Sequence, residues 1–269
     1  MKINGSFRTA LILALHLVVI FIHSLFLASG ETRDACINGA PLFDVIHNYT
    51  AEGIWPFTLF HFIDHNKIIL VLTLILVFIL IRHSQRQRIL RRFLVFHSAM
   101  SLIRAVLIWL TTLPSPTPLC LERSMDSAHI ISRSISLTLG AIGVPHGWHN
   151  IGVSGMTCCD SIISGHTSML LVLALVICSA VIGKCFKAFI WIFASLGMIG
   201  LLTTEWHYSI DVIITLIIGL LLYSWYMNKV KYDSNMFINF IEEPSLYQNK
   251  VGISPRTIAS YFRKKPSEK

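Results

Sequence analysis

The stretch Trp206-His207-Tyr208-Ser209-Ile210-Asp211 leads into an almost wholly apolar run at 212–226, and this combination decides the fold. An apolar run of this kind predicts a membrane-spanning helix. His207 and Asp211 are four residues apart, so on a helix they lie on one face and within reach of each other. Because ionisable groups in a membrane helix are costly, this pair indicates a functional site.

A second polar motif, Ser164-Gly165-His166-Thr167, also precedes an apolar run, at 169–182. Two histidines and an aspartate at two helix starts predict one catalytic site. An imidazole held by a carboxylate can attack phosphorus, while a second imidazole transfers the proton. We interpret His207 as the nucleophile, Asp211 as its orienter and His166 as the acid and later the base. This phosphohistidine chemistry requires no cofactor and no metal.

The composition places the chain among membrane proteins, since 54% of its 269 residues are hydrophobic and only 13% are charged. We expect an all-α integral membrane protein with one six-helix domain and both termini cytoplasmic. The expected helices are at about 10–28, 62–81, 93–113, 161–182, 186–203 and 207–226, with a cytoplasmic tail at 227–269. A signal peptide ending near residue 30 is the alternative for the first run, whose length favours a retained helix.

The charge distribution orients these helices. Of the 22 Lys and Arg residues, 17 fall on the proposed inner side, which is a positive-inside pattern. The basic excess therefore indicates topology and contact with anionic membrane lipids, and it argues against a nucleic-acid partner. The loop at 115–160 is expected to be irregular. His166 and His207 then lie near the outer leaflet at two helix N-termini, which favour a phosphate, so the substrate is expected to be a phospholipid headgroup.

Several other residues are candidates for the site or for covalent links. Arg104, inside the third helix, is expected either to hold the phosphate or to pair with a buried acid. Asp160 and Ser164, close to His166 in the sequence, are further candidates for substrate binding. A choline group would need an aromatic cage or a nearby carboxylate, and the residues at suitable depth are the aromatic Trp148, Trp206 and Tyr208 and the acidic Glu205 and Asp160. Disulfides among Cys36, Cys120, Cys158 and Cys159 stay open.

These motifs carry a family resemblance. The segment 158–167 resembles the Cys-Gly-Asp…Ser-Gly-His-Thr motif of the sphingomyelin synthase family, and 207–214 is similar to its His-Tyr-Thr-Val/Ile-Asp-Val-Val/Ile motif. Residues 91–114 resemble a third block of that family, and 252–256 its tail. The similarity covers about residues 82–260. Cys159 stands where the family often has glycine, and the early first helix leads us to expect a minimal member.

The resemblance implies a transferase that moves a phosphorylated headgroup from a glycerophospholipid to ceramide and releases diacylglycerol. It implies a luminal Golgi or outer plasma-membrane site and a triad at His166, His207 and Asp211. Phosphocholine, giving sphingomyelin, is favoured by the resemblance alone. Ethanolamine or inositol donors stay open, as does a homo-oligomeric state.

Two rival functions remain. A lipid phosphate phosphatase would share the Ser-Gly-His and His-x-x-x-Asp arrangement and pass the phosphoryl group to water. In that family a Ser-Arg pair before the second histidine would place Arg where this chain has Leu201. The Lys-x6-Arg-Pro signature of that family is also missing, because no Arg in this chain precedes a Pro. A non-enzymatic membrane scaffold or transporter would have no need for paired histidines and an aspartate at one leaflet.

Overall fold

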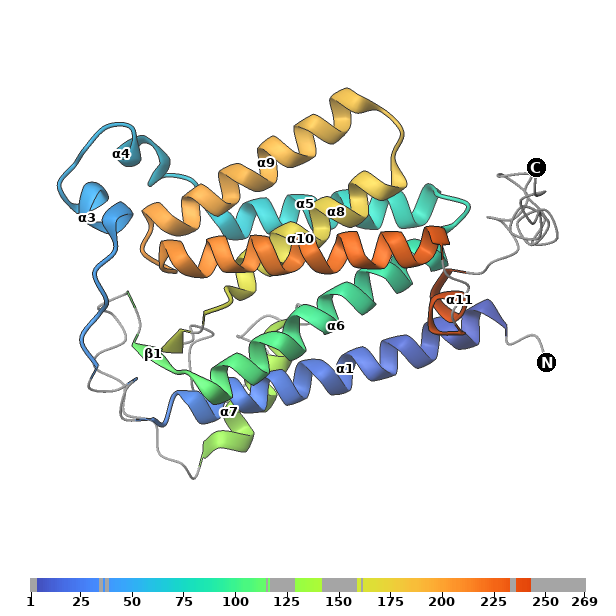
Figure 1. The fold of residues 1–269 in the computed structure, drawn as a ribbon, viewed down its shortest axis with the longest axis horizontal. Coiled ribbons are helices and arrows are strands. Elements are labelled where there is room, and N and C mark those ends of the chain that lie inside the picture. Colours follow the sequence, from blue (N-terminus) through green and yellow to red (C-terminus); the bar gives the residue numbers. More distant parts are fainter. Residues whose placement is uncertain are drawn as a thin grey trace, which may run out of the picture.

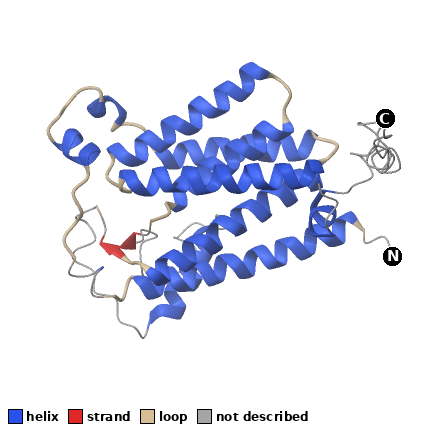
Figure 2. Cartoon of the chain, viewed as in Figure 1, coloured by secondary structure: helices blue, strands red, loops and turns tan. Residues whose placement is uncertain are grey.

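The computed structural model describes residues 4–33, 36, 39–114, 116, 129–141, 159–160, 162–232 and 236–242. In these residues regular structure is almost entirely α-helical, and one pair of two-residue strands is the exception (Figure 2). The long helices are α1 (Gly5–Gly30), α5 (His65–Arg82), α6 (Arg86–Leu110), α8 (Gly165–Ala180), α9 (Lys184–Thr203) and α10 (Ser209–Tyr232). The tail motif at 252–256 lies outside the described residues.

Five of these helices, all except α8, are long and apolar enough to cross a membrane, judged by length and composition. The shorter α8 has 16 residues, which corresponds to roughly 24 Å. It packs against α5, α6, α9 and α10, and every residue from Leu170 to Ile177 is buried. A helix that is apolar all round belongs in the core of the bundle. The predicted all-α membrane fold is confirmed.

The two ends of the bundle differ in what they carry (Figure 1). The first described residues and α11 (Met236–Glu242) lie at one end, which we call the tail end. The short helices α3 (Val45–Ala51) and α4 (Phe57–Phe60) lie at the other, which we call the loop end. Because successive long helices alternate in direction, α5, α8 and α10 all begin at the loop end. The polar residues before these helices are therefore brought together.

Helices that begin at the loop end start later than the apolar runs suggested, because polar residues cap them. α5 begins at His65 instead of 62, after Asp64, whose side chain accepts from the backbone N–H groups of residues 66 and 67. α8 begins at Gly165 instead of 161, after the capping residue Ser164. α10 begins at Ser209 instead of 207. The predicted active-site histidines therefore sit at or just before helix starts.

At the tail end the helices extend beyond the expected limits, except for α8, which ends at Ala180 instead of 182. α6 begins at Arg86, whereas the sequence suggested 93, so most of the basic cluster is helical. α10 continues to Tyr232, and α11 follows within the segment expected to be a tail from 227 onward. The reason lies in the arginines of α6, which hold α11 against the bundle.

Three arginines of the basic cluster point at the C-terminal end of α11. Arg88 Nε and Arg91 Nε donate to the carbonyl oxygens of Glu242 and Ile241 at 2.9 and 2.8 Å. Arg92 forms a two-pronged pair with the Glu242 carboxylate at 2.6 and 2.7 Å. These groups satisfy carbonyls that a helix end leaves open. Part of the basic excess expected to contact lipid is therefore engaged inside the protein.

The loop at 115–160, expected to be irregular, contains the helix α7 (Ile130–Ala141). Arg133 of α7 donates to both carboxylate oxygens of Glu31 at 2.8 and 2.9 Å, and both side chains are buried. This ion pair joins α7 to the end of α1. A short antiparallel pair, β1 (Leu113–Pro114) with β2 (Cys159–Asp160), links the end of α6 to the approach to α8. Most of the rest of this loop lies outside the described residues.

Candidate active site

His166 is held at the second position of α8 by the cap before it. The Ser164 hydroxyl accepts from the Thr167 N–H at 3.1 Å, and the Ser164 N–H donates to the Thr215 hydroxyl of α10 at 2.9 Å. These bonds tie the starts of α8 and α10 together. Ser164 itself is fully buried and is not part of the cavity wall described below. The structure thus places it as a cap, and a direct role in substrate binding stays a prediction.

His207 and Asp211 lie on one side of the start of α10. Their closest atoms, His207 Nδ1 and Asp211 Oδ2, are 3.9 Å apart, which is ion-pair distance and longer than a hydrogen bond. Asp211 Oδ2 also accepts from the Tyr208 N–H at 3.0 Å, the return half of a capping box. Asp211 is fully buried and His207 nearly so. The carboxylate therefore shapes both the helix start and the surroundings of the imidazole.

The two histidines, 41 positions apart in the chain, meet directly. His166 Nδ1 and His207 Nε2 are 3.4 Å apart, and their ring centroids are 5.6 Å apart. His207 therefore presents one nitrogen to Asp211 and the other to His166. This order, carboxylate, imidazole, imidazole, suits a nucleophile with an orienting group on one side and a proton carrier on the other.

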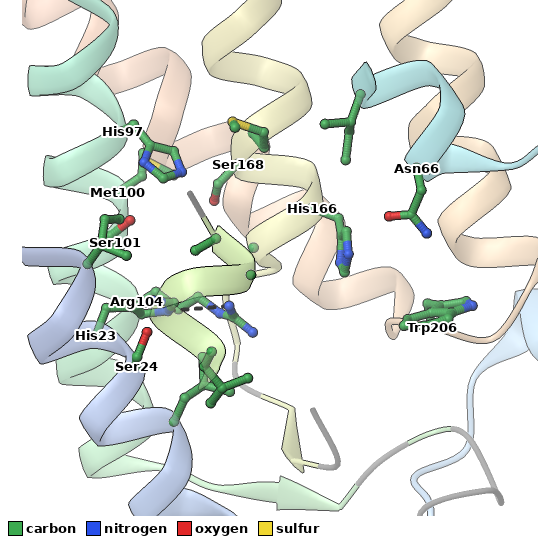
Figure 3. A pocket seen from close by; sticks show the side chains of 18 residues that line it. His23, Ser24, Asn66, His97, Met100, Ser101, Arg104, His166, Ser168 and Trp206 are labelled. Atoms are coloured by element: carbon green, nitrogen blue, oxygen red, sulfur yellow. Dashed lines mark hydrogen bonds between the residues drawn. The ribbon is translucent and has the colours of Figure 1, made fainter. Parts of the chain in front are cut away.

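The side chain of Arg104, from α6, extends to the start of α8, where it lies against Gly165 (Figure 3). A methyl group added at Gly165 would lie 2.5 Å from Arg104 Nη1, so only glycine lets the guanidinium come this close. Arg104 Nη1 also lies 3.3 Å from His23 Nε2 on α1. Since arginine has no acceptor, His23 Nε2 accepts and its proton is on Nδ1. A fixed positive charge thus lies next to the helix that carries His166.

The helix N-termini contribute unequally to this site. At α10 the Tyr208 N–H donates to Asp211, and the Ser209 N–H donates to Asp44 at 2.7 Å. Carboxylates already occupy that end, which corrects the expectation that both helix starts serve a phosphate. At α8 the N–H groups of Gly165 and His166 lie in the first turn, where a helix supplies no acceptor. Neither finds an acceptor among the described residues, so this end is open to an anion.

A cavity of about 600 Å³ opens beside these groups. Its loop-end wall carries Arg104, His166, Asn66 and Trp206 (Figure 3). Its deeper wall includes His97, which precedes Arg104 by two helical turns, or roughly 10 Å. The remaining lining comes largely from apolar or small side chains of α1, α6, α7 and α8. A volume of this size fits a polar headgroup together with part of a hydrocarbon chain.

The structure adds two residues that the sequence did not single out. His65 is buried, and its ring lies 4.9 Å from that of His166 and 5.2 Å from that of Trp206. His23 accepts the hydrogen bond from Arg104. Neither belongs to a motif, and only the position of His65 directly after a helix cap could have hinted at the site.

The remaining candidates are placed as follows. Asp160 lies in β2 opposite Leu113, and the structure describes its backbone only. Tyr208 is buried, and its hydroxyl donates to the Pro114 carbonyl, so it does not form part of an aromatic cage. Cys36 is disulfide-bonded, and its partner is not among the described side chains. Trp148 lies outside the described residues.

Comparisons with known proteins bear on the second half of the bundle. Residues 157–229 match the family model described as PAP2 superfamily C-terminal. This segment contains α8, α9 and most of α10, and with them His166, His207 and Asp211. No curated protein matches the chain. The match supports the lipid phosphate phosphatase and transferase superfamily, whose members are phosphatases and phosphotransferases, and so supports an enzyme that acts on phosphorus groups.

Proposed function

We propose that this protein is a sphingolipid synthase that transfers a phosphorylated headgroup from a glycerophospholipid to ceramide. The observation that carries the proposal is that His166, which lines the polar end of a largely apolar cavity, contacts His207, whose other ring nitrogen lies 3.9 Å from the Asp211 carboxylate. His207 and Asp211 lie behind His166 and do not line the cavity themselves. A water-soluble substrate would need no apolar extension of this kind, whereas a lipid does. The superfamily match supplies the phosphorus chemistry, and ceramide as the acceptor comes from the motif resemblance.

In the first step His207 Nε2 attacks the phosphorus of the donor, and the bond from phosphorus to the diacylglycerol oxygen breaks. His166, protonated beside the anionic donor, gives its proton to the leaving oxygen. The products of this step are diacylglycerol and a phosphohistidine at His207. The Asp211 carboxylate stabilises the positive charge that develops on the attacking ring. The two imidazoles face each other in the structure, so they must part to admit the phosphorus.

In the second step His166 takes the proton from the acceptor hydroxyl, whose oxygen attacks phosphorus. The bond from phosphorus to His207 Nε2 breaks, and the enzyme returns to its starting state. Arg104 and the N–H groups of Gly165 and His166 are placed to neutralise charge on the phosphoryl oxygens throughout. With water as the acceptor the same steps would be hydrolysis, which is the second candidate because the matched superfamily includes phosphatases.

We further propose that the loop end faces the lumen or the outside and that both chain ends are cytoplasmic. The disulfide-bonded Cys36 follows α1 at the loop end, where an oxidising compartment is expected. Cys178 and Cys185, at the α8–α9 connection, are free thiols, as expected on a reducing side. The whole chain then forms a single six-helix membrane domain, in the Golgi or the plasma membrane.

Phosphocholine is the headgroup we propose. Trp206 lines the cavity and packs against His65 and His166, which gives one aromatic face for a quaternary ammonium. The ammonium of an ethanolamine group would bind that aromatic face more weakly, because it is more strongly hydrated. An inositol ring would call for hydrogen-bonding groups such as Asn66, which lines the same wall.

The experiment is a headgroup transfer assay in liposomes with labelled ceramide. Phosphatidylcholine, phosphatidylethanolamine and phosphatidylinositol are offered in parallel, with the purified wild type, His207→Ala and His61→Ala. His61 is a matched control, because it lies at the same end but bonds the Thr203 carbonyl away from the cavity. We expect a choline-containing sphingolipid from the wild type and His61→Ala, and none from His207→Ala.

Other outcomes would exclude parts of the proposal. Release of free phosphate or phosphocholine without a ceramide product would identify a hydrolase. Product from phosphatidylethanolamine or phosphatidylinositol alone would keep the transferase and replace the headgroup. Full activity of His207→Ala would exclude the phosphohistidine mechanism. A complete lack of turnover by the wild type would favour a scaffold or transporter.

A further inference from the structure

The segment Leu42–His47, which enters α3, crosses the start of α10 beside the proposed nucleophile. It contacts three consecutive residues there: His207, Tyr208 and Ser209. These contacts join positions about 165 residues apart in the chain, so they are tertiary in origin. We call this segment the loop-end strap.

Asp44 is the main anchor of the strap. Its Oδ1 accepts from the N–H groups of Ile46 and His47, so it caps α3. Its Oδ2 accepts from the Ser209 N–H at 2.7 Å, and Oδ1 also accepts from the Ser209 hydroxyl at 2.9 Å. Partial burial raises the pKa of Asp44, but the hydrogen bonds from Ser209 and His47 lower it more, so the net pKa is lowered. One carboxylate therefore caps two helices from different parts of the chain.

Two further bonds hold the residues just before α10. His47 Nε2 lies 3.1 Å from the backbone carbonyl of His207 and, because that carbonyl can only accept, His47 carries its proton on Nε2. The Leu42 N–H donates to the Tyr208 hydroxyl at 3.0 Å, and that hydroxyl donates to the Pro114 carbonyl. The backbone of His207 is thus fixed on its strap side, while Asp211 holds the other side through the Tyr208 N–H.

We propose that the loop-end strap positions the His207 ring for attack and that Asp44 and His47 are positioning residues. This inference rests on the proposed function of His207. The position of the ring depends on its own backbone, and the strap holds that backbone through the His207 carbonyl and through the next two residues, Tyr208 and Ser209. No strap residue lines the cavity in the part of the chain that the structure describes, so the strap acts on His207 without binding the lipid.

The test compares two aspartates that cap helices in the same way at the same end. Asp64 accepts from the N–H groups of residues 66 and 67 at 3.0 and 3.3 Å, which matches the distances of the Asp44 cap on α3, 2.9 and 3.3 Å. Only Asp44 also reaches α10. Asp44→Ala and Asp64→Ala therefore remove similar caps, and Asp64→Ala also removes an exposed ion pair with Lys67 at 3.3 Å. Any additional loss in Asp44→Ala measures the two bonds to Ser209.

Steady-state headgroup transfer is measured for both variants with folded protein quantified by size exclusion. We expect kcat of Asp44→Ala to fall tenfold or more with KM for the donor within about twofold, because a displacement near 1 Å can cost about a hundredfold in rate. Asp64→Ala should keep both constants within about twofold. His47→Ala should lose rate, and His47→Gln should recover most of it, since the glutamine amide can donate to the His207 carbonyl.

Several results would overturn the inference. Equal losses in Asp44→Ala and Asp64→Ala would mean that Asp44 contributes only ordinary helix capping. A rise in KM at unchanged kcat would mean that the strap controls substrate access. A failure of His47→Gln to recover the rate would exclude His47 as a positioning residue. Each of these leaves wild-type transfer intact, whereas a wild type without turnover would overturn the proposed function and the strap together.

Discussion

Replacing Gly165 with alanine tests the part of the site that depends most on close approach. The new methyl group would lie 2.5 Å from Arg104 Nη1 and 3.1 Å from Cζ, against an ordinary contact of about 3.5 Å. The guanidinium must therefore retreat by roughly 1 Å. Because it is the far end of a flexible side chain, it can do so without disturbing the backbone.

The expected effect is a loss of rate with little loss of stability. A misplacement of about 1 Å can reduce turnover by about a hundredfold, which corresponds to about 2.7 kcal/mol in the barrier. Alanine is the better helix former by up to about 1 kcal/mol, so the unfolding temperature should stay close to that of the wild type. Initial rates of headgroup transfer per folded molecule, measured beside thermal unfolding in detergent, give both quantities.

A matched glycine and a double variant make this prediction refutable. Gly183 precedes α9, and a methyl group there would meet nothing closer than the Phe186 Cβ at 3.9 Å, so Gly183→Ala should transfer at the wild-type rate. In an Arg104→Lys background, the Gly165→Ala change should cost much less, because the forked guanidinium is gone. The same loss in both backgrounds, or a rate within twofold of wild type, would refute the reasoning.

Three further predictions concern charged groups outside the cavity. Arg133→Met should cost about 3–5 kcal/mol of stability by breaking its buried ion pair with Glu31, and the double change with Glu31→Leu should recover much of the loss in thermal scans. Glu242→Gln should loosen α11 from Arg92 and speed its proteolysis while transfer continues. Because the folded-state pKa of Asp44 is lowered from 3.8, its carboxylate stabilises the fold above that pH, and the contribution disappears as the pH falls through the folded value. The difference in Tm between wild type and Asp44→Asn should therefore shrink from about pH 6 to about pH 3.

The sequence was sufficient to predict the six long helices and the closeness of His166, His207 and Asp211. Apolar runs long enough to span a bilayer predict the long helices, because hydropathy is local. The spacing of His207 and Asp211 predicts that the two side chains lie close together. They do, although α10 begins at Ser209 and His207 is not part of the helix. Helix limits were less predictable, since they depend on partners elsewhere: α6 extends back to Arg86 because Arg88, Arg91 and Arg92 of its first turns bind α11.

The sequence by itself determined the membrane class, the alternation of helices that brings His166 and His207 to one end, and the residue types of the candidate site. Only the tertiary structure decided that His65 packs on His166, that Arg104 rests against Gly165 and that Asp44 caps α10. Periodicity along a chain encodes which face of a helix is apolar. It does not encode the rotation and offset between helices distant in sequence, and these are set by the packing of whole faces against one another.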